Sequence, residues 1–413
     1  MSLQLCVFED DHCNRLYPLS LTRPVFDLRC GMSSLLEKIV RHYPGAGLHL
    51  FVRPYLAERV RELWPQAMVN HAPGGPCLFV NGRFLFETWP VAEGRPAIWQ
   101  HAGEMVALWL PAGLPEPAAP ATSPFVLPPG PANAITHEIA GRFVNYPWDL
   151  VNNNAAELIR DFKEANLGGQ LLGRICPGVT LLEAGNIHLA AGATLKPGVV
   201  LDAEDGPIFI DAGATIMANA CLQGPLYVGK KSMIKMGAKI YEGTAIGPVC
   251  KIGGEVEASI VHGFSNKQHE GFLGHAYLGE WVNLGADTNN SDLKNNYGTV
   301  KVYIDGEMVD SGSLFVGLFM GDHAKSGINT MFNTGTVVGV MSNVFGAGYP
   351  DKFIPSFIWG GVERSETYAL DKALAVAKRV MARRKQTLTP AQERVLRTVF
   401  EMTARERAVF SGD

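Results

Sequence analysis

Hydrophobic positions in the middle of the chain recur every six residues. Between Ile210 and Ile252 an aliphatic residue stands at each sixth position without a slip, and glycine or alanine often follows it. This period fits neither the turn of an α-helix, about 3.6 residues, nor the alternation of an ordinary strand. It predicts three hexads per coil, each with one aliphatic side chain pointing inward, and therefore a parallel β-helix. The positions are Leu189, Leu195, Leu201, Ile210, Ile216, Leu222, Val228, Ile234, Ile240, Ile246, Ile252, Phe272, Leu278, Leu284, Met320, Ser326, Phe332, Val338 and Val344.

The segments on either side of the hexads have different patterns. Residues 1–165 predict an α/β domain, with strands at Leu3–Phe8 and Cys77–Val80 and a helix at Met32–Tyr43. A stretch rich in proline and alanine, 111–134, predicts a long loop. We expect three parts: an α/β domain at 1–165, a left-handed parallel β-helix at 166–362 and a helical tail at 363–413.

The tail predicts two amphipathic helices. Leu370, Leu374 and Met381 share one helical face, and Thr389-Pro390-Ala391-Gln392 combines an N-cap, a proline at the first helical position and a capping glutamine. We expect these helices to cap the β-helix or to pack on a neighbouring subunit.

Composition narrows the class of protein. The 413 residues carry a net charge of −4, so no broad basic field favours nucleic acid. No run of 18 apolar residues predicts a membrane span, and the N-terminus shows no basic-then-apolar leader. Seven scattered cysteines, an odd number without a C-x-x-C pair, are typical of reduced thiols in the cytoplasm.

A histidine interrupts the hexads at position 269, within SNKQHEGFLGHAYLGEWVNLGADTNN. An imidazole titrates near neutral pH and can accept a proton from an attacking amine, so His269 is a candidate general base. The ordinary alternative is a corner residue of the β-helix without a chemical role. His275 and His323 remain open between solvated, interface and site residues. His262, His269 and His275 follow one another at spacings of seven and six, and this spacing does not favour a zinc site.

The residues around His269 resemble the left-handed β-helix acyltransferases. The resemblance covers HEGFLG at 269–274, AYLG at 276–279, VNLGA at 282–286 and the segment from Gly321-Asp322 to TVVG at 336–339. It is strongest to the acetyltransferase half of the bifunctional N-acetylglucosamine-1-phosphate uridyltransferase/glucosamine-1-phosphate acetyltransferase family.

This resemblance implies roles for individual positions. It implies that His269 is the general base and that Phe272 and Asn283 line the sugar site. It further implies that Ala286 and Ile328 contact acetyl-CoA, in a groove between the β-helices of a homotrimer, with no metal in that site. One departure concerns the acceptor: the lysine that binds the sugar phosphate in the family falls on Glu257, and Lys267 is the candidate substitute.

The N-terminal region resembles a sugar nucleotidyltransferase through NRLYPLSLTRP at 14–24. Three departures argue against catalysis there. Glu9–Cys13 replaces the glycine-rich phosphate loop, Val25 replaces a basic residue, and Arg83 stands where a metal-binding aspartate is expected. Arg15 and Arg23 are candidates to hold a sugar phosphate or nucleotide, and Mg²⁺ is expected only if nucleotidyl transfer is retained.

Three functions therefore stay open. The first is acetyl-CoA-dependent acyl transfer to an amino-sugar phosphate by the β-helix, with a nucleotidyltransferase-like N-terminal domain. The second is a sugar-1-phosphate nucleotidyltransferase whose β-helix is structural. The third is a non-catalytic, trimeric scaffold that binds nucleotide sugars. The sequence does not choose the sugar, the nucleotide, or amine over hydroxyl as the acceptor.

Overall fold

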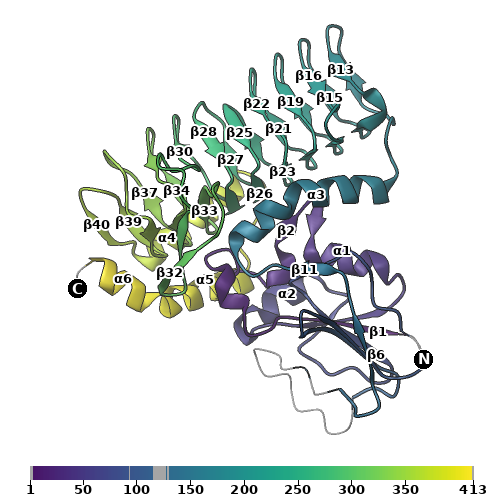
Figure 1. Ribbon diagram of the computed structural model, residues 1–413. Helices are drawn as coiled ribbons and strands as arrows, with labels where there is room; N and C mark the ends of the chain where they lie inside the picture. The colour runs from purple at the N-terminus through teal and green to yellow at the C-terminus, as the bar shows by residue number, and fades with distance from the viewer. Residues whose placement is uncertain (1–2, 93, 115–126, 128–129, 412–413) are drawn as a thin grey trace.

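The computed structural model describes residues 3–92, 94–114, 127 and 130–411, and it contains an α/β domain, a long stem and a set of C-terminal helices (Figure 1). Most of the predicted loop at 111–134 lies outside the described residues. The α/β domain lies against the side of the stem, and helix α3 (Pro147–Ala165) runs along that contact. None of the described helices is long and apolar enough to span a membrane.

A seven-stranded mixed sheet forms the centre of the α/β domain, in the order β10-β8-β9-β6-β1-β4-β5. Strand β1 pairs in parallel with β4 and β6, whereas β6, β9 and β8 pair antiparallel. The predicted strands are confirmed as β1 and β6, and the predicted helix as α1, which opens with a capping box at Ser34. The bounds are β1 (Gln4–Phe8), β4 (Gly47–Phe51), β5 (Met68–Val69), β6 (Cys77–Asn81), β8 (Ala97–His101), β9 (Glu104–Leu110), β10 (Ile135–Glu138), α1 (Leu35–His42) and α2 (Ala57–Leu63). Shorter elements are β2 (Arg29–Cys30), β3 (Ser33–Ser34), β7 (Phe84–Phe86), β11 (Gly141–Phe143), η1 (Cys13–Leu16), η2 (Val25–Asp27) and η3 (Pro54–Leu56).

The stem is the expected parallel β-helix, in which each short strand pairs in parallel with the strand one coil away. Its first face contains β12 (Arg174–Ile175), β15 (Thr194–Leu195), β18 (Thr215–Ile216), β21 (Met233–Ile234), β24 (Lys251–Ile252), β27 (Asn266–Lys267), β34 (Lys325–Ser326), β37 (Asn343–Val344), β39 (Ile358–Gly360) and antiparallel β40 (Ser365–Thr367). Its second face contains β13 (Thr180–Leu182), β16 (Val200–Asp202), β19 (Cys221–Gln223), β22 (Lys239–Ile240), β25 (Glu255–Glu257), β28 (Phe272–Gly274), β30 (Asn289–Asn290) and β35 (Met331–Phe332). Its third face contains β14 (Ile187–Leu189), β17 (Ile208–Ile210), β20 (Leu226–Val228), β23 (Thr244–Ile246), β26 (Ile260–Gly263), β29 (Tyr277–Glu280), β33 (Leu318–Met320), β36 (Thr336–Val338) and β38 (Phe353–Ile354); η4 (Ala184–Asn186) precedes β14.

The aliphatic hexad residues form the core of the stem, as the period predicts. One assignment is wrong: Leu273 is the buried residue of β28, and Phe272 faces outward and is half-buried. The hexad count slips after Ile252 because the next coil is shorter, with Val256 and Val261 as its inward residues. The period of six therefore no longer identifies the inward residues in the segment just before His269.

A long insertion and the C-terminal helices pack around the C-terminal coils of the stem. The hairpin of β31 (Lys301–Ile304) and β32 (Glu307–Asp310) leaves the stem between β30 and β33. Both predicted tail helices are confirmed, as α4 (Leu370–Ala382) and α5 (Pro390–Met402), and α6 (Ala404–Ser411) follows. The α5 capping box uses Thr389, and α5 packs on α2 of the α/β domain. The tail thus bridges the stem and the α/β domain.

Candidate functional site

Coil stacking brings the predicted catalytic and cofactor positions onto one corner of the stem, which we call the His269 edge (residues 268–271, 285–288 and 327–330). The Asp287 amide donates to the Glu270 carbonyl at 3.1 Å, and the Asn329 amide donates to the Ala286 carbonyl at 2.8 Å. Successive coils therefore present His269, then Ala286, then Ile328. The His269 side chain is exposed, and Ile328 is 71% exposed.

Lys267 lies in the interior of the stem and does not face a substrate. The side chain is only 2% exposed, and its Nζ donates to the His269 carbonyl at 2.8 Å. Burial lowers the pKa of Lys267 to about 8, although nearby acids raise it. Contrary to the sequence interpretation, Lys267 is placed to hold the corner that carries His269. Its inward position follows from the pairing with Ile252.

A groove lies beside the His269 edge, between the first face of the stem and the end of α4. Its volume is about 420 Å³. Arg384 closes one side by donating to the Val249 carbonyl at 2.8 Å and to Asn266 Oδ1 at 2.6 Å. We call this feature the basic groove, because its lining includes four cationic side chains and no carboxylate. The lining residues are Lys251, Phe264, Asn266, Gln268, Trp281, Asn283, Lys325, Val380, Arg383 and Arg384.

The charges in the basic groove affect each other. Burial lowers the pKa of Lys251, and the neighbouring arginines lower it further. Burial lowers the pKa of Lys325 to about 8. Clustered cations without acids favour an anionic ligand, which would relieve this repulsion. The predicted residue Asn283 lines the same groove. Gln268, which directly precedes His269 in the sequence, lines it as well.

A second histidine flanks strand β28 on its other side. His275 Nδ1 lies 2.9 Å from Asp292 Oδ2, and the His275 ring stacks on Phe315 with centroids 5.1 Å apart. A carboxylate oriented in this way fixes the tautomer and orientation of an imidazole. No sequence pattern points to Asp292, because this residue belongs to the insertion that breaks the hexads. Phe272 lies on the outer surface of β28, between the two histidines.

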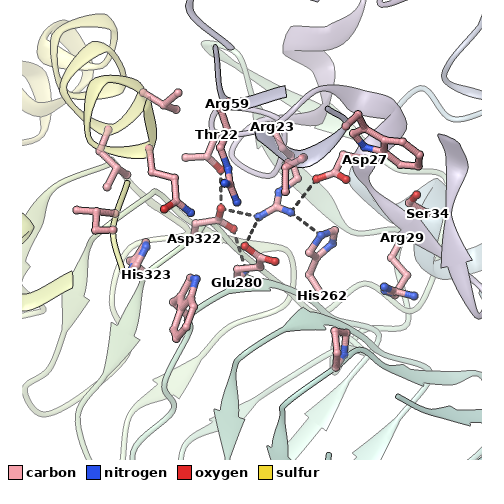
Figure 2. A pocket seen from close by; sticks show the side chains of 18 of the residues that line it. Thr22, Arg23, Asp27, Arg29, Ser34, Arg59, His262, Glu280, Asp322 and His323 are labelled. Atoms are coloured by element: carbon pink, nitrogen blue, oxygen red, sulfur yellow. Dashed lines mark hydrogen bonds and ion pairs between the residues drawn. The ribbon is translucent and has the colours of Figure 1, made fainter. Parts of the chain in front are cut away.

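Arg23 forms an ionic cluster between the α/β domain and the stem (Figure 2). Its side chain is buried, and its guanidinium lies 3.2 Å from the Asp27 carboxylate, 2.6 Å from Asp322 and 3.4 Å from Glu280. Its Nη1 also contacts His262 Nε2. That Arg23 holds a sugar phosphate or nucleotide stays a prediction; carboxylates on both sides of the domain contact already engage its guanidinium.

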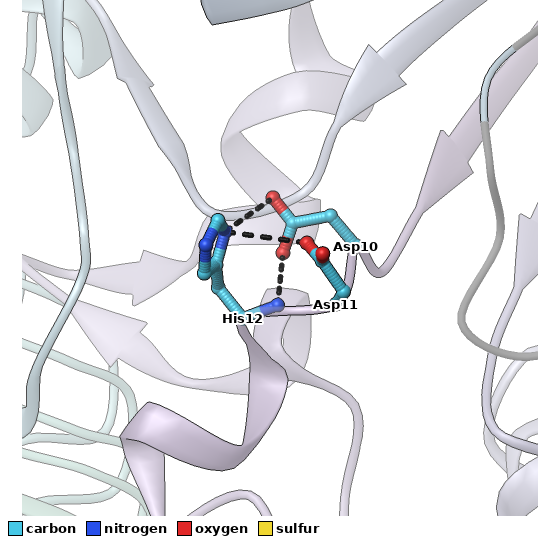
Figure 3. A group of neighbouring side chains, drawn as sticks. All are labelled: Asp10, Asp11 and His12. Carbon is cyan, nitrogen blue, oxygen red and sulfur yellow. Dashed lines mark hydrogen bonds and ion pairs between the residues drawn. The ribbon is translucent and has the colours of Figure 1, made fainter.

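Acidic and basic groups also meet at the carboxyl edge of the mixed sheet. Asp10, Asp11 and His12 follow β1 and place one ligand atom each within 4.8 Å of the others (Figure 3). The guanidinium of Arg83 at the end of β6 is fully buried and lies 2.5 Å from Asp10. The predicted residue Arg15 is half-buried in η1, one turn beyond this cluster.

This edge does not suit Mg²⁺. Besides Asp10, Arg83 engages Glu104 and donates to Asn145 Oδ1 at 2.7 Å. Asp10 and Glu104, two of the carboxylates at this edge, are thus already paired with a guanidinium, which weakens them as ligands for a hard divalent cation. We therefore derive no metal-dependent step for the α/β domain.

One family model and several known proteins are similar to parts of this chain. Residues 5–168 match the family model described as sugar nucleotidyl transferase. A bifunctional sugar-1-phosphate nucleotidylyltransferase/acetyltransferase of Sulfurisphaera tokodaii is 32% identical over 97 residues, covering 23% of this chain and 24% of the relative. The bifunctional protein GlmU of Bartonella bacilliformis is 30% identical over 130 residues, covering 30% of this chain and 29% of the relative. The matches thus span less than a third of the length of each of these relatives.

Solved structures with a similar fold are acyltransferases by name. A UDP-N-acetylglucosamine acyltransferase has 16% identity and a TM-score of 0.20, covering 47% of this chain and 70% of that one. AntD, an N-acyltransferase from Bacillus cereus in complex with dTDP and coenzyme A, has 10% identity and a TM-score of 0.18, covering 54% and 96%. At these scores the structures add no argument about function.

Proposed function

We propose that the protein is a trimeric cytoplasmic transferase that moves an acyl group from acetyl-CoA to an amino-sugar phosphate at the His269 edge. The observation that carries this proposal is the basic groove, whose lining includes four cations, no acid and Gln268, the chain neighbour of the exposed His269. The name of the Sulfurisphaera tokodaii relative, which joins nucleotidyl and acetyl transfer, supports the same reaction class.

The groove suits the phosphate groups of coenzyme A. Lysine and arginine bind phosphates through charge-assisted hydrogen bonds, and these are strongest where water is excluded. Lys325 of the stem and Arg383 at the end of α4 both line the groove. With the phosphates held there, the thioester arm would reach the His269 edge, where Ala286 and Ile328 offer small and apolar contacts.

The chemistry requires a single proton acceptor. The amine nitrogen of the acceptor attacks the thioester carbonyl carbon, a C–N bond forms and the C–S bond breaks. The imidazole of His269 takes the proton that the amine loses and returns it to the departing thiolate. Phe272 and Asn283 lie on the strands next to this corner and are proposed to contact the sugar.

Exposed apolar side chains support a second copy of the chain at this edge. Ile328 and Phe345 lie on successive coils, and Met236 lies at the same corner of an earlier coil. Apolar side chains gathered on a surface commonly mark an interface, and three such edges close a trimer. We propose that the acyl site is completed by a neighbouring subunit.

The test is release of free thiol from acetyl-CoA in the presence of amino-sugar phosphates. The double variant Lys325→Met/Arg383→Met should raise the KM for acetyl-CoA at least about 10-fold, since it removes two phosphate contacts. Arg142→Met, on the exposed strand β11, is the matched control. Wild-type protein without turnover on any amine or hydroxyl sugar phosphate, or a double variant with unchanged KM, would refute the proposal.

Sugar nucleotidyl transfer is the second candidate, because the family model covers the α/β domain. The engagement of Asp10 and Glu104 by Arg83 opposes it. Pyrophosphate release from UTP or dTTP with sugar 1-phosphates and Mg²⁺ would favour this candidate. Absence of both activities, with a raised Tm in nucleotide sugars, would leave a binding scaffold.

A further inference from the structure

A separate cavity lies where the α/β domain, the β31–β32 hairpin, the stem and the tail meet. Tyr17 follows η1, Tyr303 and Asp305 belong to the hairpin, Phe353 to β38 and Glu406 to α6. We call the space that these five residues line the tail cavity. Its volume is about 100 Å³, well above the roughly 10–15 Å³ that one water needs, so it has room for a molecule of several heavy atoms. It shares no lining residue with the basic groove.

Most of the wall of the tail cavity is aromatic or aliphatic. The ring of Tyr303 stacks on Phe353 with centroids 3.9 Å apart, and Tyr17 lines the cavity from the α/β domain. Val337 is a buried aliphatic residue of the wall, and Met402 at the end of α5 is 45% exposed. The cavity therefore opens to solvent beside Met402 and offers an apolar surface to the carbon atoms of a ligand.

Two carboxylates carry the charge of this wall. Asp305 is exposed and accepts a hydrogen bond from Asn14 Nδ2. Glu406 is half-buried, and its carboxylate has neither a hydrogen bond nor an ion pair within the part of the chain that the structure describes. No lysine, arginine or histidine is among the described residues that line the cavity. The tail cavity thus combines an apolar wall with two negative charges and no positive one.

The two carboxylates affect each other and the phenol beside them. Burial raises the pKa of Glu406, and Asp305 raises it further, whereas Arg407 opposes the rise. Burial also raises the pKa of Tyr303, as do both carboxylates. Arg407 does not pair with Glu406; its Nη1 donates instead to Thr403 Oγ1 at 2.7 Å. A cation in the cavity would relieve the repulsion between the carboxylates.

We propose that the tail cavity binds a small aliphatic amine in its protonated form. The ammonium group donates to the Glu406 carboxylate and to the remaining oxygen of Asp305, through charge-assisted hydrogen bonds. The aliphatic carbons pack on Val337 and Phe353, and the electron-rich faces of rings such as Tyr17 attract a nearby cation. A hard metal ion suits the cavity less, because Mg²⁺ or Ca²⁺ needs about six oxygen ligands, and here it would lie against aromatic rings.

Such a ligand would contact all four parts of the chain that meet at the tail cavity. Tyr17 belongs to the α/β domain, and Asp305, Phe353 and Glu406 belong to the hairpin, the stem and the tail. A ligand that binds only when these parts are packed together stabilises the folded chain, so the amine should raise the Tm. The proposal does not depend on acyl transfer, because the His269 edge contributes no residue to the tail cavity.

The test measures the Tm of the full chain and, by calorimetry, the binding of n-butylamine, 1-butanol and MgCl₂ at constant ionic strength. At about pH 7.5 n-butylamine is protonated, because an aliphatic amine such as the lysine side chain titrates near about 10.4. We expect n-butylamine to raise the Tm and to bind at least about 10-fold more tightly than 1-butanol, which has the same chain without the charge. Glu406→Gln keeps the shape of the side chain and should weaken amine binding at least about 10-fold.

Controls separate this site from the rest of the tail and from the acyl-transfer site. Glu401→Gln removes an exposed carboxylate of α5 outside the cavity and should leave amine binding unchanged. His269→Ala should also bind the amine like the wild type, whether or not acyl transfer is found. If Glu406→Gln fails to fold, Asp305→Asn in the exposed turn of the hairpin replaces it. No binding of n-butylamine, equal effects of n-butylamine and 1-butanol, a larger effect of Mg²⁺ than of the amine, or a cavity variant that binds the amine like the wild type would each overturn the proposal.

Discussion

Lys267 is the residue that most directly controls the position of His269, through its buried ammonium group. It occupies an inward position of the stem, where the neighbouring coil has Ile252, and its hydrogen bond to the His269 carbonyl ties the exposed corner to the core. The ammonium is expensive to bury, since burial opposes its charged form. Its presence there favours a role in shaping the corner over a role in stability.

The variant Lys267→Met tests that role. Methionine keeps the volume and removes the buried charge, so we expect an unchanged or raised urea midpoint. We also expect faster amide exchange at 268–271 and a kcat lowered about 10-fold or more, because a small misplacement of a catalytic group is costly. A large loss of stability together with unchanged exchange at the corner would contradict this account.

His323 makes stability depend on pH. Burial, together with Lys325 and Arg23, lowers its pKa to about 3, although Asp322 opposes the shift. Below its ordinary pKa of about 6.5 the unfolded chain binds a proton that the folded chain does not, so stability falls as pH falls. Between pH 7.5 and 5.0 this loss is about 2 kcal/mol.

The matched variant His323→Phe removes that proton and keeps the ring. Urea unfolding at the two pH values should show a smaller acid-induced loss in the variant than in the wild type, by about 2 kcal/mol. The neighbouring His262 is present in both proteins and cancels in the comparison. Equal losses in the two proteins would show that His323 is protonated in the folded state.

Among the elements, the coils of the stem were the most predictable from sequence. A coil buries its aliphatic residues against its neighbours, and this constraint repeats every six residues from Ile210 to Ile252. The register beyond that point was not predictable, because shortened corners move the inward position from Phe272 to Leu273. Because of the same change of register, the sequence period did not identify Lys267 as an inward residue.

The register of β28 is tested by a pair of alanine variants. Leu273→Ala should lower the free energy of unfolding by about 2–5 kcal/mol, because it leaves a cavity in the stem. Phe272→Ala should cost clearly less, since that ring lies on the outer surface, and should instead raise the KM for the acceptor. Urea unfolding of both variants decides the matter, and a reversed order would mean that Phe272 is the inward residue.

The arrangement of the whole molecule depends on contacts between residues far apart in the sequence, which no local sequence pattern predicts. Arg23 in the α/β domain is 299 residues from its partner Asp322, and the motif around Arg23 suggested a ligand contact instead. His269, Ala286 and Ile328 were found from a local resemblance, and the stem brings them to one edge. The basic groove was not found, because it combines stem residues with the end of α4.

The Arg23 cluster predicts strong coupling between the α/β domain and the stem. Arg23→Met should lower the free energy of unfolding by about 3–5 kcal/mol, because it leaves Asp322 and its neighbours buried without a cation. Asp322→Asn in the same background should recover part of that loss. A double-mutant cycle from urea unfolding measures the coupling, and additive effects would show that the cluster does not join the two parts.

The most direct test of the acyl-transfer site is the rate of thiol release at saturating acetyl-CoA and amino-sugar phosphate for His269→Ala. Its matched control is His137→Ala, which removes an exposed histidine from β10. Loss of the general base should lower kcat about 10²–10⁴-fold in His269→Ala and leave His137→Ala at the wild-type rate. A wild-type kcat in His269→Ala, or a loss that appears only in His275→Ala, would contradict the assignment of His269 as the base.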